Sequence, residues 1–190
     1  MDNVSLSLPS NIFSQPLLQK QLNEGALPIP LYKQAIKDVR EYLDSEFMAE
    51  RDIRELIKLR AVFIDQLLTS IWHQYTWPEG RICLVAAGGY GRGELHPHSD
   101  IDLLILIDNS DEINTHNIEA FITLLWDINL DIGHSVRTIS QCVEEAVKDI
   151  TVTTNLMESR PLAGSTALHQ QLSLRTGPDK TWSSSEFFSA

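Results

Sequence analysis

Two short, nearly continuous apolar runs most constrain the fold of this 190-residue chain: residues 82–87 (ICLVAA) and 101–107 (IDLLILI). Uninterrupted apolar runs of this length are typical of strands that are covered on both faces, because neither set of alternating side chains is polar. Strands of this kind need helices packed against their sheet, so the runs favour a layered fold that contains both helices and strands.

The rest of the chain supplies patterns of both kinds. Residues 32–43 and 51–75 carry apolar side chains at three- and four-residue spacing, which predicts amphipathic helices, the second ending before Pro78 and Gly80. Beyond the second run, the pattern predicts these further elements: helices at 113–128, 140–157 and 165–174, and extended segments at 130–137 and 160–162. Strands alternating with helices predict an α/β fold class.

The domain organisation follows from these patterns. Residues 1–30 are polar and contain four prolines, which predicts a flexible or loosely docked arm. Residues 31–78 are expected to form a helical extension and 79–175 the core domain. Residues 176–190 end in what resembles the opening turns of a helix, so they are expected to begin a following segment that is truncated.

The charge of the chain limits its partners. The sequence has 26 Asp and Glu against 15 Lys and Arg, a net charge of −11, and no basic run. Nucleic acids and anionic membrane surfaces are therefore not expected as partners. The chain lacks the pattern of a signal peptide or a membrane span, which predicts a cytoplasmic protein. Cys83 and Cys142 form no metal-binding or disulfide pattern, and Cys83 is expected to be a buried apolar residue.

The segment between the two apolar runs carries the chemistry. Residues 88–93 (GGYGRG) contain four glycines directly after a predicted strand, so the backbone there either approaches another group closely or takes positive φ angles. The segment is not a GxGxxG loop, because Glu94 stands at the position of the third glycine, and it lacks the lysine of a Walker loop.

Asp100 and Asp102 stand two residues apart at the start of the second strand, so their carboxylates share one face about 6.6 Å apart along the strand. At an effective dielectric constant near 20, two unit charges repel by roughly 4 kcal/mol at about 4 Å, and by less at the spacing of this pair. For an isolated pair of this kind, the favoured interpretation is that Asp100 caps a turn and that Asp102 is solvated at the end of a strand. The glycines just upstream instead favour a site for a divalent cation, which prefers oxygen ligands.

A strand that ends in Gly-Gly, a short helix and then Asp-x-Asp resembles the polymerase-β-type nucleotidyltransferase superfamily. The strings GGYGRGELHPHSDIDLLIL, LLWDINLDIGHSVRT and TNLMESRPLAG further resemble the amino-terminal domain of the uridylyltransferase/uridylyl-removing enzymes that modify PII proteins. The resemblance runs from about residue 36 to the C-terminus and is densest over 84–164. Glutamine-synthetase adenylyltransferases and enzymes linked to CBS domains share much of the motif.

The resemblance implies a polymerase-β-like domain at 79–175, with a small mixed sheet flanked by helices and an N-terminal helical extension. It implies that Asp100, Asp102 and Asp131 hold two Mg²⁺ ions, and that Asp131 also helps to activate the attacking hydroxyl. Gly88 and Gly89 are expected to bring backbone N–H groups to the triphosphate.

The implied reaction is the transfer of UMP from UTP to a tyrosine of a PII protein, with release of pyrophosphate. Two alternatives stay open. One is the same chemistry with ATP or with another acceptor, and the other is an inactive nucleotide-binding or docking module. The hydrolase and ligand-sensing domains of full-length relatives are not found in this sequence, so removal of UMP is not expected.

Other residues of the motif have competing interpretations. Arg92 either contacts phosphates or pairs with Glu94 or another surface acid. Ser99 either donates to a phosphate or caps the turn, and the turn role is favoured. His134 and Arg137 are expected to be structural, with Arg137 the better candidate of the two for a nucleotide contact.

His96 and His98 flank a proline, which favours a turn over a metal site because Mg²⁺ prefers oxygen. Phe121 and Trp126 are expected in the core of the fold, and Asp127 on the surface of a helix.

Overall fold

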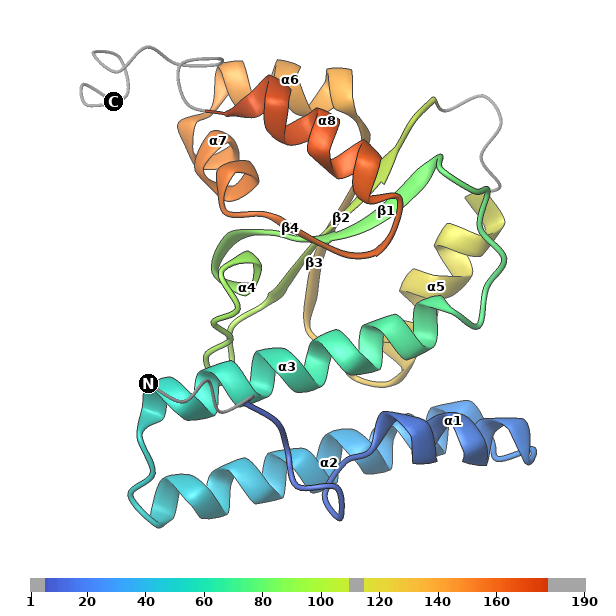
Figure 1. The fold of residues 1–190 in the computed structure, drawn as a ribbon, viewed down its shortest axis with the longest axis vertical. Coiled ribbons are helices and arrows are strands. Elements are labelled where there is room, and N and C mark those ends of the chain that lie inside the picture. The colour runs from blue at the N-terminus through green and yellow to red at the C-terminus, as the bar shows by residue number, and fades with distance from the viewer. Residues whose placement is uncertain (1–5, 110–114, 178–190) are drawn as a thin grey trace. The chain divides into compact units, whose positions relative to one another are not determined.

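The computed structural model describes residues 6–109 and 115–177. The chain divides into two compact units, and Figure 1 labels their elements. The first, which we call the helical unit, comprises Met1–Tyr75, Gly93–Ser99 and Glu119–Asp131. The second, which we call the sheet unit, comprises Thr76–Arg92, Asp100–Ile118 and Ile132–Ala190. Helix α5, Thr115–Asp127, begins in the sheet unit and ends in the helical unit.

The helical unit is built around α3, Ile53–Trp72, which runs antiparallel to α2, Pro28–Met48 (Figure 1). Helix α1, Gln15–Asn23, also packs on α3. Helix α3 supplies more buried side chains to the unit than any other element, because its apolar residues recur at helical spacing. The ring of Trp72 at the end of α3 meets the edge of Phe121, with ring centroids 5.2 Å apart.

The N-terminal segment, predicted as a flexible or loosely docked arm, contains α1 and the start of α2. Both Pro16 and Pro28 lie in the first turn of a helix, where the missing N–H costs nothing because that donor has no partner within the helix. The segment is also packed: the ring of Phe13 meets that of Phe63 at 4.9 Å, and Leu18 is buried. Residues 1–5 of the predicted arm lie outside the described residues, as do residues 178–190 of the predicted following segment.

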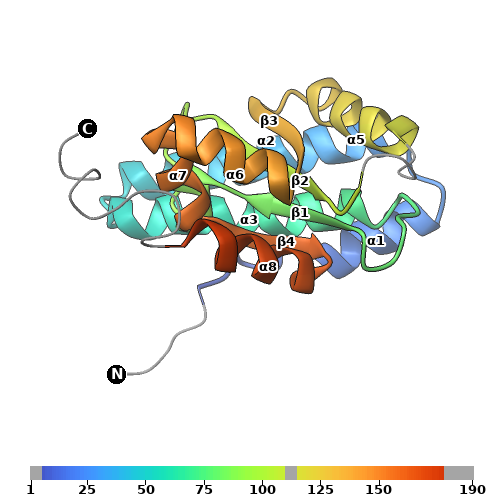
Figure 2. The same cartoon turned by 90° about the horizontal axis from the view of Figure 1, so that it is seen from above.

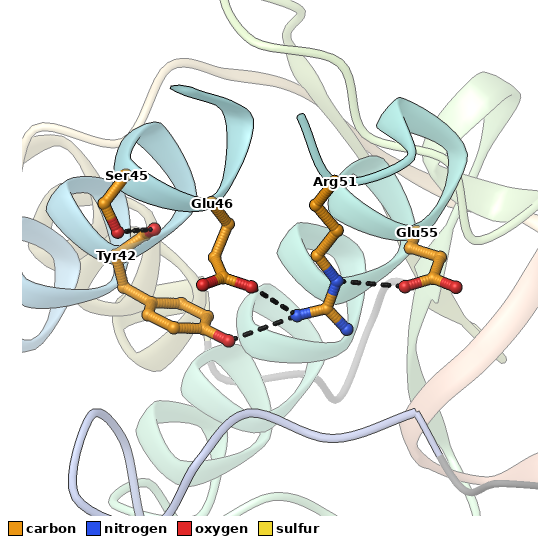
Figure 3. Close-up of polar contacts among 5 residues, drawn as sticks. All are labelled: Tyr42, Ser45, Glu46, Arg51 and Glu55. Atoms are coloured by element: carbon orange, nitrogen blue, oxygen red, sulfur yellow. Dashed lines mark hydrogen bonds and ion pairs between the residues drawn. The ribbon is translucent and has the colours of Figure 1, made fainter. Parts of the chain in front are cut away.

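A charged network closes the turn between α2 and α3 (Figure 3). The Arg51 guanidinium donates to Glu46 at 2.8 Å, to Glu55 at 2.9 Å and to the Tyr42 hydroxyl at 3.2 Å. The Asp52 side chain caps the first turn of α3. Ion pairs at this level of exposure contribute about 1 kcal/mol or less each, so the network chiefly sets the geometry of the helical hairpin.

The sheet unit contains β1, Ile82–Ala86, β2, Ile101–Ile107, β3, Ile132–Thr138, and β4, Arg160–Gly164. The strand order is β3-β2-β1-β4, with β2 and β3 parallel and the other pairs antiparallel. This mixed sheet confirms the predicted fold class.

Three helices cover one face of the sheet: α6, Ile139–Lys148, α7, Ile150–Met157, and α8, Thr166–Thr176 (Figures 1 and 2). Their buried side chains meet those of alternate residues on the two central strands. The residues of this core are Cys83, Val85, Leu104, Leu106, Cys142, Ala146, Leu156, Leu168 and Leu172. The intervening residues of β1 and β2 are buried too, as the continuous apolar runs predicted. Asp102, which shares the face of Leu104 and Leu106, is half-buried.

Both cysteines lie in this core, which confirms the prediction for Cys83. Each is fully buried, and burial raises the pKa of the Cys83 thiol to about 12 and that of Cys142 to about 11. Thiols in this environment stay protonated and act as small apolar side chains.

The predicted helix at 140–157 is two helices in the structure. Asp149 takes an extended conformation, with φ −138° and ψ 117°, and its side chain accepts a hydrogen bond from the Thr151 N–H at 2.7 Å. An aspartate that bonds the backbone two residues ahead competes with continued helix and starts a new one. Residues 113 and 114 of the predicted helix at 113–128 lie outside the described residues.

The prediction that Trp126 is a core residue is wrong. Its side chain is 53% exposed, whereas the adjacent Leu125 is fully buried. Successive residues on a helix point about 100° apart, so burial of Leu125 turns its neighbour toward solvent. Phe121, four residues before Leu125 on the same face, is buried as predicted. Within the described residues, no helix has the length and apolarity needed to cross a bilayer.

A buried histidine of the sheet unit makes the stability of the fold depend on pH. His169 on α8 lies with its Nε2 3.1 Å from the Ser159 Oγ. Burial lowers the pKa of its imidazole below 6.5, although a hydrogen bond to the Ser159 backbone acts in the opposite direction. The unfolded chain therefore takes up a proton before the folded chain does, and stability is lost as the pH falls through 6.5.

We expect the His169→Gln substitution to flatten the decline in unfolding free energy between about pH 7.5 and about pH 5.5, as measured by urea denaturation. His73, which is exposed, provides the control: His73→Gln should leave the decline as it is in the wild type. A wild-type stability that does not fall over this interval would contradict the assignment.

Candidate functional site

The glycine-rich segment forms a four-residue helix, α4, Gly88–Gly91, directly after β1. Gly88 has φ +56°, which favours glycine. A Cβ added to Gly88 would lie 3.0 Å from the Asp102 Oδ2 and 3.5 Å from the Asn155 Oδ1. The backbone of Ala87, the residue before α4, donates to the Asp102 carbonyl at 3.0 Å. The start of α4 and the second aspartate are thus in direct contact.

A second glycine lies against the same carboxylate. Gly133 on β3 is the register partner of Asp102 on β2, and a Cβ added there would lie 2.7 Å from the Asp102 Oδ1. The Asp102 carboxylate therefore occupies a space between Gly88 and Gly133 that exists because neither residue has a side chain. The half-buried carboxylate at this position is held by backbone on two sides.

The electrostatics of the two aspartates are unfavourable without a cation. Asp100 is exposed one residue before β2, and Asp102 is half-buried within the strand. Burial raises the pKa of the Asp102 carboxyl, and the charge of Asp100 raises it further. Paired oxygen donors with this unbalanced negative charge fit a hard divalent cation such as Mg²⁺.

The third predicted carboxylate, Asp131, is exposed at the last residue of the helical unit. It directly precedes Ile132, the first residue of β3, which pairs with Ile101 on β2. Within residues 6–109 and 115–177, no group of three or more His, Cys, Asp and Glu side chains is gathered closely enough to hold a metal ion. The structure therefore brings Gly88 and Gly133 to the Asp102 carboxylate, with the charge of Asp100 nearby, but forms no complete three-carboxylate site among the residues it describes.

The three predicted nucleotide contacts Arg92, Ser99 and Arg137 each have different surroundings in the structure. Arg92 forms an ion pair with Glu158, which is the surface-acid alternative for this residue. The Ser99 hydroxyl donates to the His96 carbonyl at 2.9 Å, which is the turn alternative. Arg137 pairs in register with Leu106, four residues along β3 from Gly133 and thus about 13 Å from it.

The flanking histidines lie where the turn interpretation expects them. His96 and His98 are exposed, and His98 has φ +66°, a left-handed conformation that tight turns use. Asp127 is exposed on α5, as predicted.

Sequence reasoning did not identify Gly133, Asn155 or Arg160 as part of this region. A glycine inside a strand pattern is a known sign of close approach by another group, so Gly133 carried a usable signal. Asn155 and Arg160 lie in the string TNLMESRPLAG that carries the resemblance, but nothing local gave them a role, because their contacts join segments that are far apart in the sequence.

The space at Gly133 leads to a testable expectation. In the Gly133→Ala variant, the new methyl group displaces the Asp102 carboxylate, whose side chain can rotate away at little cost in stability. If Asp102 holds a metal ion, as the resemblance implies, we expect metal-dependent nucleotide binding to weaken at least about tenfold, since loss of the groups that support a metal ligand typically costs about 10–100-fold. Isothermal titration with Mg²⁺ and a nucleoside triphosphate measures the effect.

The control for this variant is Ser135→Ala on the same strand, which should bind as the wild type does. Wild-type binding by Gly133→Ala would show that the Asp102 carboxylate does not need this space.

Comparison with known proteins agrees with this geometry. Residues 68–159, which include β1, α4, β2 and β3, match the nucleotidyltransferase domain family. The chain therefore contains a nucleotidyltransferase domain, and its mixed four-stranded sheet fits the polymerase-β-like fold that the resemblance implied.

The chain is similar along nearly its whole length to curated proteins named bifunctional uridylyltransferase/uridylyl-removing enzyme. It is 52% identical over 94% of its length to the protein of Stutzerimonas stutzeri (strain A1501) and 50% identical over 95% to that of Azotobacter vinelandii. It is 51% identical over 94% to the protein of Pseudomonas fluorescens (strain SBW25). In each case it spans about a fifth of the relative, 20% of its length. The predicted resemblance is confirmed.

Proposed function

We propose that this domain transfers UMP from UTP to a tyrosine hydroxyl of a PII-type regulatory protein and releases pyrophosphate. The observation that carries the proposal is the Asp102 carboxylate, which lies between Gly88 and Gly133 and beside Asp100. The choice of a uridylyl group rests on the name shared by the relatives, and the choice of PII and tyrosine rests on the resemblance in sequence.

Asp100 and Asp102 would hold the divalent metal, with Asp131 proposed as the third carboxylate at the start of β3. When bound, Mg²⁺ would neutralise triphosphate charge and align the reacting oxygens. The raised pKa of Asp102 fits this role, since a nearby cation favours the ionised carboxylate that burial and Asp100 disfavour.

The proposed reaction is a displacement at the α-phosphorus. The acceptor hydroxyl oxygen forms a bond to that phosphorus, the bond to the bridging oxygen of the β-phosphate breaks, and pyrophosphate leaves. The Asp131 carboxylate is proposed to take the hydroxyl proton. Gly88 and Gly89 are proposed to lie along the triphosphate, where the absence of side chains allows the backbone to approach it.

Arg92 is a weaker candidate for the same phosphates, because a phosphate would have to displace Glu158 from its ion pair. Ser99 and Arg137 stay weaker predicted contacts, given the turn contact of Ser99 and the position of Arg137 along β3. The cytoplasmic location expected from the sequence stays a prediction.

The direct test is label transfer to a purified PII-type protein from UTP or ATP labelled at the α-phosphate, with Mg²⁺ or with EDTA. We expect labelling from UTP in the presence of Mg²⁺ and none with EDTA. Preferential labelling from ATP would replace the uridylyl proposal with the adenylyl alternative. Nucleotide binding without transfer would favour the inactive docking module.

A further inference from the structure

Helix α4 is too short to maintain its own position. Four residues span only about 6 Å, and a helix of this length gains few internal hydrogen bonds for the backbone that it orders. Three of its residues are also glycines, which disfavour helix. Contacts from elsewhere in the sheet unit must therefore hold α4 in place.

Those contacts come from residues 158–160, which comprise the turn between α7 and β4 and the first residue of β4. Arg160 donates from Nε to the Gly91 carbonyl at 3.1 Å and from Nη2 to the Tyr90 carbonyl at 3.3 Å. Its guanidinium carbon also lies 5.3 Å from the centre of the buried Tyr90 ring. The last carbonyls of a helix have no partners within the helix. The Arg160 guanidinium donates to two such carbonyls at the end of α4, and it also lies over the Tyr90 ring.

The neighbouring residue supports the same end of the helix. The missing side chain of Gly91 lets α4 pack directly on the Glu158 carbonyl, because an added Cβ would collide with that oxygen. The Glu158 carboxylate pairs with Arg92, the residue after α4. Arg160 itself is the register partner of Ala86 at the end of β1, so it links α4 to the strand that leads into it.

The other end of α4 is the end that meets the site. Gly88 lies against the Asp102 carboxylate, and only two residues separate it from Gly91. A shift of the Gly91 end is therefore expected to move Gly88, since a single helical turn joins the two ends.

We propose that Arg160 is a positioning residue for the nucleotide site: it holds α4 so that Gly88 stays beside the Asp102 carboxylate. The expected effect on nucleotide binding rests on the proposed nucleotidyl transfer, whereas the contact between Arg160 and α4 does not. The role requires the planar fork of arginine, because two carbonyls and a ring face are engaged at once. A lysine would keep the charge and lose that geometry, whereas it would still serve as a direct phosphate ligand.

The test compares Arg160→Lys and Arg160→Met with the wild-type chain. The first measurement is amide hydrogen exchange at Gly91 and Arg92, whose N–H groups donate to Ala87 and Gly88 within this turn. We expect exchange to be at least about tenfold faster in both variants, while the amides that pair β1 with β2 keep their protection. The second measurement is kcat and KM for UTP, with KM expected to rise about tenfold or more in both variants.

Arg81 provides the matched control. It lies just before β1, at the opposite end of that strand from α4, and forms an ion pair with Asp108 at 3.9 Å. The Arg81→Lys and Arg81→Met variants should keep wild-type exchange in α4 and a KM within about twofold of the wild type.

Each other outcome has a defined meaning. Unchanged exchange in α4, or equally faster exchange throughout the sheet, would overturn the positioning role. If Arg160→Lys kept the wild-type KM while Arg160→Met lost binding of UTP, Arg160 would be a direct phosphate ligand and not a positioning residue. If the wild-type chain transfers no nucleotide, the proposed function fails, and the exchange measurement alone decides whether Arg160 positions α4.

Discussion

Replacing Asp102 with asparagine is expected to reduce nucleotide transfer about 100-fold or more and, in magnesium-free buffer, to stabilise the fold. The loss of transfer follows if Asp102 is a metal ligand. Even the substitution of a residue that only supports such a ligand typically lowers metal affinity or activity about 10–100-fold. The gain in stability follows from its raised pKa: burial and the charge of Asp100 disfavour the ionised carboxylate in the folded state. A neutral side chain of the same shape removes that penalty.

The contribution of Asp102 to stability also depends on pH. Because the folded-state pKa of Asp102 lies above the ordinary value of 3.8, the folded chain binds the proton more tightly than the unfolded chain. This carboxyl therefore lowers stability as the pH rises from 3.8 through its folded-state pKa. The Asp102→Asn variant should lose this contribution, as shown by thermal unfolding at a series of pH values.

Magnesium should make the wild type more stable than Asp102→Asn, the reverse of the order expected without Mg²⁺. Binding to the folded state raises its stability, so Mg²⁺ should increase the Tm of the wild type and leave that of Asp102→Asn nearly unchanged. Asp127→Asn serves as the control, since this aspartate is exposed on α5. A variant that kept full transfer activity, or one that unfolded at a lower temperature without Mg²⁺, would contradict the assignment of Asp102.

Of the substitutions considered for stability, Gly164→Ala is expected to have the largest effect. It should lower the free energy of unfolding by about 2–4 kcal/mol. Gly164 ends β4 with φ +86°, where a side chain is strained. An added Cβ would also collide with the Ile82 carbonyl and lie 3.1 Å from the Cys83 Cα. Both neighbours are backbone of β1, so neither can move without disturbing the pairing of β4 with β1.

Urea denaturation of both chains measures this loss, and Gly80→Ala separates its two causes. Gly80 has φ +72° with nothing within 4 Å of an added Cβ, so its substitution reports backbone strain alone. We expect Gly80→Ala to cost about 1–2 kcal/mol. Equal losses for the two variants would show that contact with β1 adds nothing at Gly164.

The fold was accessible from the sequence where the signal was local. The apolar runs predicted β1 and β2, because burial on both faces leaves a pattern within a few residues. The helices at Pro16 and Pro28 were missed, since a proline at a first helical turn and a proline in an irregular arm look alike without the tertiary contacts of Phe13 and Leu18. Trp126 was misplaced because helical spacing leaves the edge of an apolar face undefined.

The two apolar runs by themselves determined the central strands, and the spacing of Asp100 and Asp102 determined that two carboxylates lie at the start of one of them. Only the tertiary structure decided what surrounds those carboxylates. Gly133 meets Asp102 through the parallel pairing of β3 with β2, and Arg160 reaches the Tyr90 carbonyl of α4 from 70 residues further along the chain. Contacts of this kind depend on strand order, and strand order is set by packing between segments rather than by the pattern within any one of them.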